Sequence, residues 1–364
     1  MILKLSQRNF GLDILRAISI WLVLLQHGKI LNIDGLKGLT LGGIGVEIFF
    51  VLSGFLIGQI IIRNLQKSNT IKCIVNFWIR RWFRILPLYY LMLLFKFTII
   101  DSSIGSNILY YIFFLQNNFY GIEYYEVTWS LVIEEWFYII IPIFLFLTLK
   151  LSRKKNNVVI ILFILFILFE NIIRLIYVKK FNVPYSGVNG NVIFRMDALF
   201  YGVLLAYIKI NFQNIFIKLS SLPIFIFSLI CFITYIYFII TFSKLELGIN
   251  GYIIPRTIGF TIFPLIIAFI LPFFDSKSSF FQNSIPRKIY YKFITYTSLL
   301  TYSIYLVHPL IFEQLINKKL FKMVPEISFI LATTLTYMIS YILFKFFEAP
   351  ILKYRNKKFS DRVT

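Results

Sequence analysis

Long apolar runs separated by short, mostly basic segments fill this chain from end to end. Each run is about 17 to 25 residues long, the length that an α-helix needs to cross the hydrocarbon core of a bilayer. We expect about ten spanning helices, near residues 10–30, 44–63, 85–101, 128–149, 157–178, 192–209, 222–242, 252–272, 296–316 and 326–348. The pattern predicts an all-α, polytopic membrane bundle.

Residues 109–120 are apolar but too short to cross, so we expect a re-entrant or interfacial piece there; the alternative is an extra helix. The first run contains Arg16 and lacks a small-residue cleavage site, which favours a retained helix over a signal peptide. We expect residues 1–350 to form one membrane domain and residues 351–364 a short basic cytoplasmic tail.

The formal net charge of +21 would suggest nucleic acid as a partner of a soluble protein. Here most Lys and Arg residues fall in alternate connections, which is the pattern that sets membrane orientation. The other connections contain fewer basic residues, namely Lys29, Lys37, Lys179, Lys180, Lys244, Lys318, Lys319 and Lys322. We therefore expect both termini in the cytoplasm, anionic lipid headgroups as partners of the basic loops, and no nucleic acid.

Arg16 and His27 stand on the first predicted helix, eleven positions apart. That spacing turns an ideal helix by about 1100°, which returns the side chains to within roughly 20° of one face, about 16 Å apart along the axis. A cation inside a bilayer is costly, so it usually faces a cavity, a partner or a substrate. The pair predicts a polar path through the bundle.

Further polar residues fall in the outer half of other predicted helices. They are Glu47, Glu134, Glu135, Arg195, Asp197 and His308. A His beside a carboxylate is suited to general-base chemistry, because the carboxylate fixes the tautomer and steadies the imidazolium. Structural alternatives remain: Arg195 and Asp197 can neutralise each other or other buried charges, His308 can be a packing residue, and Glu47 can be a helix-start acid.

Three arginines, Arg80, Arg81 and Arg84, lie among aromatic residues just before Pro87, which we take as the entry to the third helix. Guanidinium groups suit phosphates by charge and geometry, although composition alone favours anchoring to lipid headgroups. The sequence has no Walker-type phosphate loop and no spacing typical of a metal site. Cys73 and Cys231 are given no function.

Seven short elements, in the same order, resemble those of the membrane-bound acyltransferase family 3, the O-acyltransferases of bacterial surface sugars. They are the Arg-x10-His pair, GVEIFFVLSGFLI with Glu47 and Ser53, RRWFRILPLYY, WSLVIEEWFY, RMDALFYG, YSIYLVHPL and FFEAP. Glu47 stands where many relatives have Asp. The resemblance covers positions 13 to 350.

The resemblance implies an acyl-CoA donor, most simply acetyl-CoA, on the cytoplasmic side and a hydroxyl acceptor outside. The acceptor would be a surface glycan such as O-antigen, capsule or exopolysaccharide, or a lipid-linked sugar, and the protein would sit in the bacterial inner membrane. The nucleotide end would bind near Arg81 and Arg84. Acyl-CoA is then a substrate, and no tightly bound cofactor or metal is expected.

Our hypothesis is that His27, oriented by Glu134, deprotonates the acceptor hydroxyl for attack on the thioester. A His-bound acyl intermediate is the two-step variant. Arg16 would bind the donor or stabilise charge on the thioester oxygen.

A transporter or flippase for a lipid-linked sugar or small anion is the alternative function, because such proteins also carry charges in the membrane. The sequence shows neither an inverted repeat nor paired broken helices, which disfavours transport. The oligomeric state cannot be inferred from the sequence.

Overall fold

The computed structural model describes residues 8–28, 41–119, 121–152, 156–245, 248–284, 288–317 and 325–359. These residues form helices and connecting turns, with no strand among them. The predicted all-α fold class is therefore confirmed. The loops 29–40, 153–155 and 318–324, which carry part of the predicted charge asymmetry, and the tail residues 360–364 lie outside the described residues.

Ten long helices form the bundle: α1 (Phe10–His27), α2 (Leu41–Lys67), α3 (Ile71–Phe95), α6 (Thr128–Leu151), α7 (Asn156–Phe181), α9 (Met196–Asn211), α11 (Leu222–Lys244), α13 (Gly259–Ser276), α15 (Lys288–Phe312) and α16 (Pro325–Leu343). Within the described ranges, eight helices are long and apolar enough to cross a membrane. The two predicted spans outside that set are α9, with 16 residues, and α15. The number of crossings thus stays a prediction.

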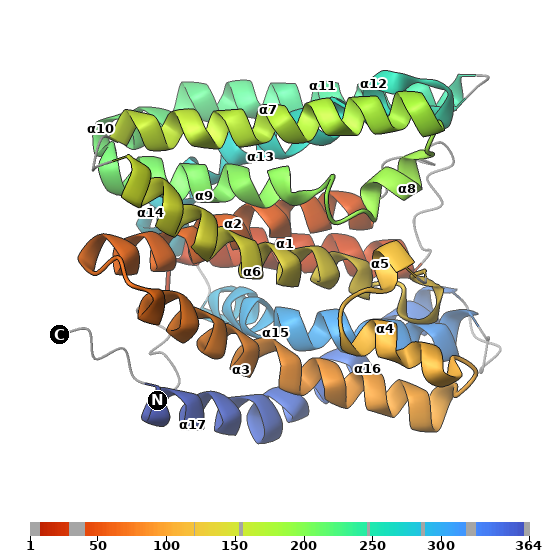
Figure 1. The fold of residues 1–364 in the computed structure, drawn as a ribbon. Coiled ribbons are helices and arrows are strands. Elements are labelled where there is room, and N and C mark those ends of the chain that lie inside the picture. Colours follow the sequence, from red (N-terminus) through yellow and green to blue (C-terminus); the bar gives the residue numbers. More distant parts are fainter. Residues whose placement is uncertain are drawn as a thin grey trace.

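Helix α2 lies at the centre of the bundle, between α1 and α9 (Figure 1). In the most apolar 18-residue stretch of α2, 72% is buried inside the structure, compared with 17% for α11 and 28% for α7. The apolar side chains on α7 and α11 are largely exposed, among them Ile161, Leu165, Leu168 and Ile172 on α7. Since such a surface is stable only against hydrocarbon, these two helices have the character of lipid-facing elements.

Small residues let α2 and α9 approach closely. A Cβ atom added to Gly54 would lie 2.0 Å from the carbonyl oxygen of Leu199, and one added to Gly202 would lie 2.1 Å from that of Val51. One turn further along, Gly58 faces Ala206. Such small-residue contacts are how membrane helices gain close van der Waals packing when lipid supplies no hydrophobic driving force.

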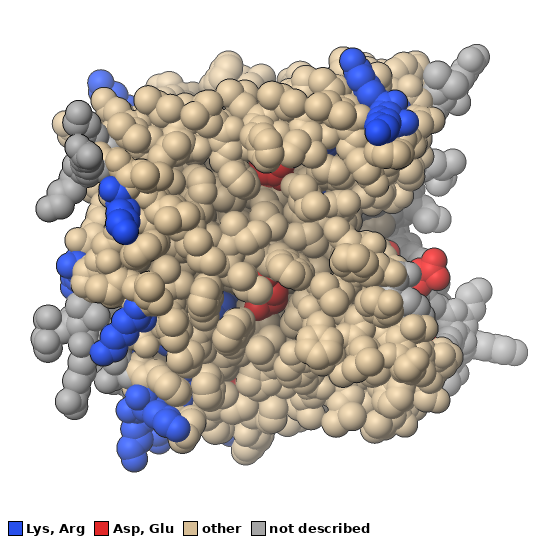
Figure 2. Space-filling view, viewed as in Figure 1, with Lys and Arg blue, Asp and Glu red and all other residues tan. Residues whose placement is uncertain are grey.

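The two ends of the bundle carry different connections. The short helices α10 (Gln213–Leu219) and α17 (Ala349–Lys358) lie at the left in Figure 1, and α8 (Tyr185–Asn189), α4 (Ile108–Ile112) and α5 (Gln116–Phe119) lie at the right. Most blue Lys and Arg side chains in Figure 2 gather along the same left edge, with a smaller group at the upper right. This separation agrees with the predicted alternation of loops, and the absolute orientation stays a prediction.

The predicted start of the third helix is wrong. Helix α3 begins at Ile71, carries Pro87 in its interior and continues through a π-helical turn to Ile100. Thirty residues span about 45 Å, more than the hydrocarbon core, so part of α3 extends beyond it. Hydropathy placed the three arginines before the start of the third span, whereas polar partners allow them to lie within α3.

Residues 351–358 of the predicted tail are helical and dock on α3. Arg80 Nη1 donates to the carbonyl of Phe359 at 3.0 Å, and Arg355 Nη1 donates to the carbonyl of Arg80 at 3.1 Å. Residues 108–119 contain α4 and α5, helices of 5 and 4 residues that are too short to cross a membrane. That outcome matches the predicted interfacial piece rather than an extra span.

The α2–α9 contact gives a first testable prediction. Gly54→Ala and Gly202→Ala each place a Cβ against backbone that cannot yield without separating the helices, so we expect a loss of more than about 3 kcal/mol. Gly190→Ala is the matched control, because its nearest atom would be 3.6 Å away. Folded protein recovered from membranes should fall several-fold for the first two only. Wild-type recovery of Gly54→Ala would contradict this packing.

Candidate active site

Asp13, in the first turns of α1, is held by two strong partners. Arg8 donates to it from Nε at 2.8 Å and from Nη2 at 2.5 Å. Ser298 of α15 donates its hydroxyl to Oδ1 at 2.6 Å. Arg16 lies farther away, with Nη1 3.9 Å from Asp13 Oδ1, and its side chain is 27% exposed. Because Arg8 and Ser298 engage the carboxylate more closely, Asp13 neutralises Arg16 only weakly.

Arg81 of α3 meets α2 and α6 in the interior. Its Nη2 donates to the Tyr138 hydroxyl at 2.6 Å and lies 4.0 Å from Glu134 Oε2. Ser53 Oγ is 2.5 Å from the same Tyr138 hydroxyl. Three residues predicted from the sequence, Ser53, Arg81 and Glu134, are therefore brought together by Tyr138. The sequence analysis missed Tyr138, although it stands four residues after Glu134 and so shares its helix face.

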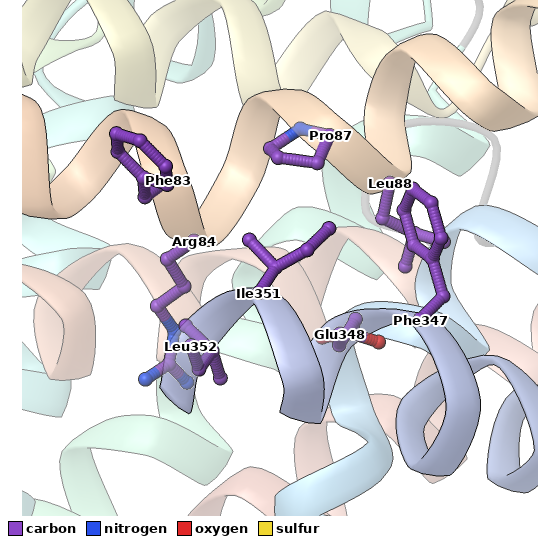
Figure 3. A pocket seen from close by; sticks show the side chains of 8 residues that line it. All are labelled: Phe83, Arg84, Pro87, Leu88, Phe347, Glu348, Ile351 and Leu352. Atoms are coloured by element: carbon purple, nitrogen blue, oxygen red, sulfur yellow. The ribbon is translucent and has the colours of Figure 1, made fainter. Parts of the chain in front are cut away.

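Arg84 lines a recess between α3 and the segment formed by α17 and the turn before it (Figure 3). Its side chain passes Leu352, and the Glu348 carboxylate points away from it in this view. Glu348 accepts a short hydrogen bond from the Ser303 hydroxyl. The empty volume is ≈ 170 Å³. This figure includes open solvent, and the recess has no room for a water molecule, so it is not a formed ligand cavity in this conformation.

Arg8, Arg16, Arg81 and Arg84 form one arginine cluster. Arg84, Arg8 and Arg81 all lie close enough to Arg16 to repel its charge. Like charges inside a bundle are unfavourable unless an anion or a carboxylate offsets them. Arg8 is bonded to Asp13, and Arg81 is bonded to the Tyr138 hydroxyl with Glu134 4.0 Å away. Arg16 shares Asp13 with Arg8 at a distance of 3.9 Å, and Arg84 has no carboxylate within 4.0 Å among the described residues. The cluster has the charge and the donor geometry of a site for a phosphorylated ligand.

His27 and His308, the chain's two histidines, lie against each other. Their ring centroids are 4.9 Å apart with an interplanar angle of 69°. His27 ends α1 and is partly exposed, whereas His308 is fully buried in α15. Eleven residues of helix separate His27 from Arg16, about 16 Å of rise, so the histidine pair and the arginine cluster lie at different depths of the bundle.

Glu134 and Glu135 have different surroundings. The side chain of Glu134 is 15% exposed and faces Arg81. Glu135 is buried, and its Oε1 has no hydrogen-bond partner. Glu134 is thus the member of the predicted pair that joins the polar site.

Glu47, Arg195 and Asp197 belong to a second buried charge cluster. Arg195 pairs with Glu47, and Arg174 Nη2 donates to Asp197 Oδ2 at 2.7 Å. Arg174 also lies 3.6 Å from Glu170, one turn earlier on α7. Glu170 and Arg174 were missed, although their i, i+4 spacing inside an apolar run was a usable signal. Because these charges pair across α2, α7 and α9, the cluster favours a role in holding the helices together.

The part of the chain that the structure describes contains no set of side chains arranged to bind a metal ion. No group of three or more His, Cys, Asp or Glu side chains there could hold an ion. Cys73 and Cys231 are both free thiols.

Residues 9–347 match the family model described as an acyltransferase domain. The O-acetyltransferase OatA of Staphylococcus aureus strain NCTC 8325 is 28% identical over 385 residues, which cover 96% of this chain and 58% of OatA. A protein of Staphylococcus aureus strain COL, named only as a candidate O-acetyltransferase, is 32% identical over 216 residues. That match covers 54% of this chain and 34% of the relative.

The chain thus spans little more than half of the length of OatA and a smaller part of the other relative. No solved structure matches this chain. The family model covers nearly the whole chain, including Arg16, His27 and the buried His308. The protein is a member of the membrane-bound acyltransferase family 3.

Proposed function

We propose that this protein is a membrane O-acetyltransferase that moves an acyl group from acyl-CoA, most simply acetyl-CoA, to a hydroxyl of a surface glycan or lipid-linked sugar. The donor would bind from the cytoplasm and the acceptor would lie on the outer side of the bacterial cytoplasmic membrane. The names of the O-acetyltransferase relatives support the chemistry. The observation that carries the proposal is the arrangement of an arginine cluster and a histidine pair along one helix, α1.

The arginine cluster fits the nucleotide end of acyl-CoA. This end carries several phosphate charges, which guanidinium groups bind by paired, charge-assisted hydrogen bonds. Arg16 and Arg84 are the members least engaged by protein carboxylates, so a phosphate would relieve their mutual repulsion. Arg81 is held in place by Tyr138 and Glu134, and its positive charge would add to those of Arg16 and Arg84.

The distance from Arg16 to His27 fits the extended arm of the donor. About 16 Å of helical rise separates the two side chains, and both lie near one face of α1. An acyl-pantetheine arm is long and thin, so it could follow this face with its thioester near His27. This path would bring the acyl group to the outer half of the bundle while the nucleotide stays at the arginine cluster.

The proposed reaction is a direct acyl transfer. His27 takes the proton of the acceptor hydroxyl as its oxygen attacks the thioester carbonyl carbon. The carbon–sulfur bond then breaks, and the proton passes from His27 to the departing thiolate of coenzyme A. Glu134 lies 4.0 Å from Arg81, and in this proposal it holds that arginine in place rather than orienting His27.

His27→Ala tests the base. We expect the rate of acetyl transfer at saturating acetyl-CoA to fall by about 10²–10⁴-fold, because general-base catalysis contributes that much. The measurement uses labelled acetyl-CoA with membranes and counts label in the glycan fraction, at equal amounts of protein in the membrane. Retained glycan labelling by His27→Ala would exclude the mechanism. A wild-type protein that labels no glycan would favour the transport alternative.

Arg84→Ala tests donor binding, with Arg80→Ala as the matched control. Both changes remove one positive charge from α3, but Arg80 bonds the carbonyl of Phe359 whereas Arg84 belongs to the arginine cluster. A lost charge-assisted hydrogen bond weakens binding by about 1.5–3 kcal/mol, so KM for acetyl-CoA should rise roughly 10- to 100-fold for Arg84→Ala alone. An equal rise for both variants, or none, would refute the assignment.

A further inference from the structure

His308 lies directly behind the proposed base. Its ring meets that of His27 edge-on at 4.9 Å between centroids, across the contact of α15 with α1. His27 is partly exposed at the end of α1, whereas none of His308 is exposed. The pair is therefore layered, with one imidazole partly exposed and the second one enclosed beneath it.

The backbone of α15 fixes the tautomer of His308. Its Nδ1 lies 3.0 Å from the carbonyl oxygen of Ile304, one turn earlier. A carbonyl oxygen can only accept, so Nδ1 carries the hydrogen and donates it. The other ring nitrogen, Nε2, is then a lone-pair acceptor, and it is buried with no hydrogen-bond partner. A buried acceptor without a partner costs about 1–3 kcal/mol, so its retention calls for a reason.

Among the described residues, the two aromatic rings packed against His308 supply no donor for this atom. The rings of Tyr305 and Phe312 lie beside it, with centroids 5.8 Å and 5.9 Å away. The Tyr305 hydroxyl already donates to the carbonyl of Val127 at 2.7 Å. His27, by contrast, carries a ring N–H in either neutral tautomer. Its ring centroid lies 4.9 Å from that of His308, so a small rotation of the side chain could bring this N–H to Nε2. Catalytic hydrogen bonds are often loose before substrate binds and tighten in the complex.

We propose that His308 is a positioning residue for the reaction described above, so this inference rests on the proposed function. Nε2 of His308 accepts a hydrogen bond from one ring nitrogen of His27, which leaves the other nitrogen unprotonated and aimed at the acceptor hydroxyl. His27 takes the hydroxyl proton on that second nitrogen and passes it to the thiolate of coenzyme A. His308 gains and loses no proton, and its lone pair stabilises the transient His27 imidazolium.

This arrangement assigns to a neutral imidazole the task that a carboxylate performs beside many catalytic histidines. The carboxylate expected in this place, Glu134, lies with Arg81 and Tyr138. A neutral partner suits a bundle interior, because no additional charge has to be desolvated there.

Two substitutions separate positioning from packing. The amide of His308→Gln reaches the place of Nε2 and can still accept from His27, but it gives up the bond to Ile304. The amide of His308→Asn lies near the place of Nδ1 and keeps the bond to Ile304, but it places no acceptor where Nε2 faces His27. A positioning role predicts that Gln preserves activity better than Asn, whereas a packing role predicts the reverse.

The test uses labelled acetyl-CoA with membranes containing the full chain at equal amounts, and it separates kcat from KM. We expect His308→Asn to lower kcat at least about tenfold more than His308→Gln, with KM for acetyl-CoA unchanged in both. The double variant His27→Ala/His308→Asn should be no slower than His27→Ala alone, because His308 acts only through His27.

Equal or better activity of Asn than of Gln, or an additive loss in the double variant, would overturn the role of His308. His27→Ala in the same assay distinguishes the two proposals. If His27→Ala keeps its activity, the base assignment itself fails. If His27→Ala is inactive but the order of Asn and Gln is reversed, only the inference about His308 fails.

Discussion

A charged side chain inside a helix bundle is not solvated by bulk water, so its placement depends on what else can offset the charge. In this protein, most buried charges are offset by direct partners. Arg195 pairs with Glu47, Arg174 pairs with Asp197, and Arg8 pairs with Asp13. The first two pairs join α2 and α7 to the start of α9, and they accompany the close glycine contacts between α2 and α9. The paired charges thereby help to fix the helices that hold the site.

The same constraint makes the arginine cluster informative. Arg16 and Arg84 lie near each other, and the closest carboxylates, Asp13 and Glu348, are engaged by Ser298 and Ser303. A bundle that pairs Arg8, Arg174 and Arg195 with carboxylates has no structural need to crowd two more arginines together. An anionic ligand is the physical reason that accounts for both facts, and the phosphates of an acyl-CoA have the required charge. The path along α1 then connects that ligand to the histidine pair.

Much of the fold could be predicted from the sequence, because a membrane span has a characteristic length and apolar character. That the segment of α4 and α5 is too short to cross the membrane also followed from length alone. The start of α3 could not be predicted in this way. Hydropathy treats Arg80, Arg81 and Arg84 as too polar for a buried helix, and only tertiary partners such as Tyr138 make that position favourable. The helical residues of the tail were missed for a similar reason, since their contacts with Arg80 come from the fold.

The residues of the candidate site were visible in the sequence, but their partners were not. Helical spacing placed Arg16 and His27 on one face, whereas nothing in the sequence indicated that His308 would meet His27 or that Glu134 would join Arg81. Such pairings depend on how distant helices pack. The central claim is that one acyl-CoA molecule extends from the arginine cluster to the histidine pair. A structure of the protein with a non-hydrolysable acetyl-CoA analogue tests it most directly. The account predicts phosphates bound by Arg16, Arg81 and Arg84 and the acetyl carbonyl beside His27, whereas an analogue bound away from both groups would contradict it.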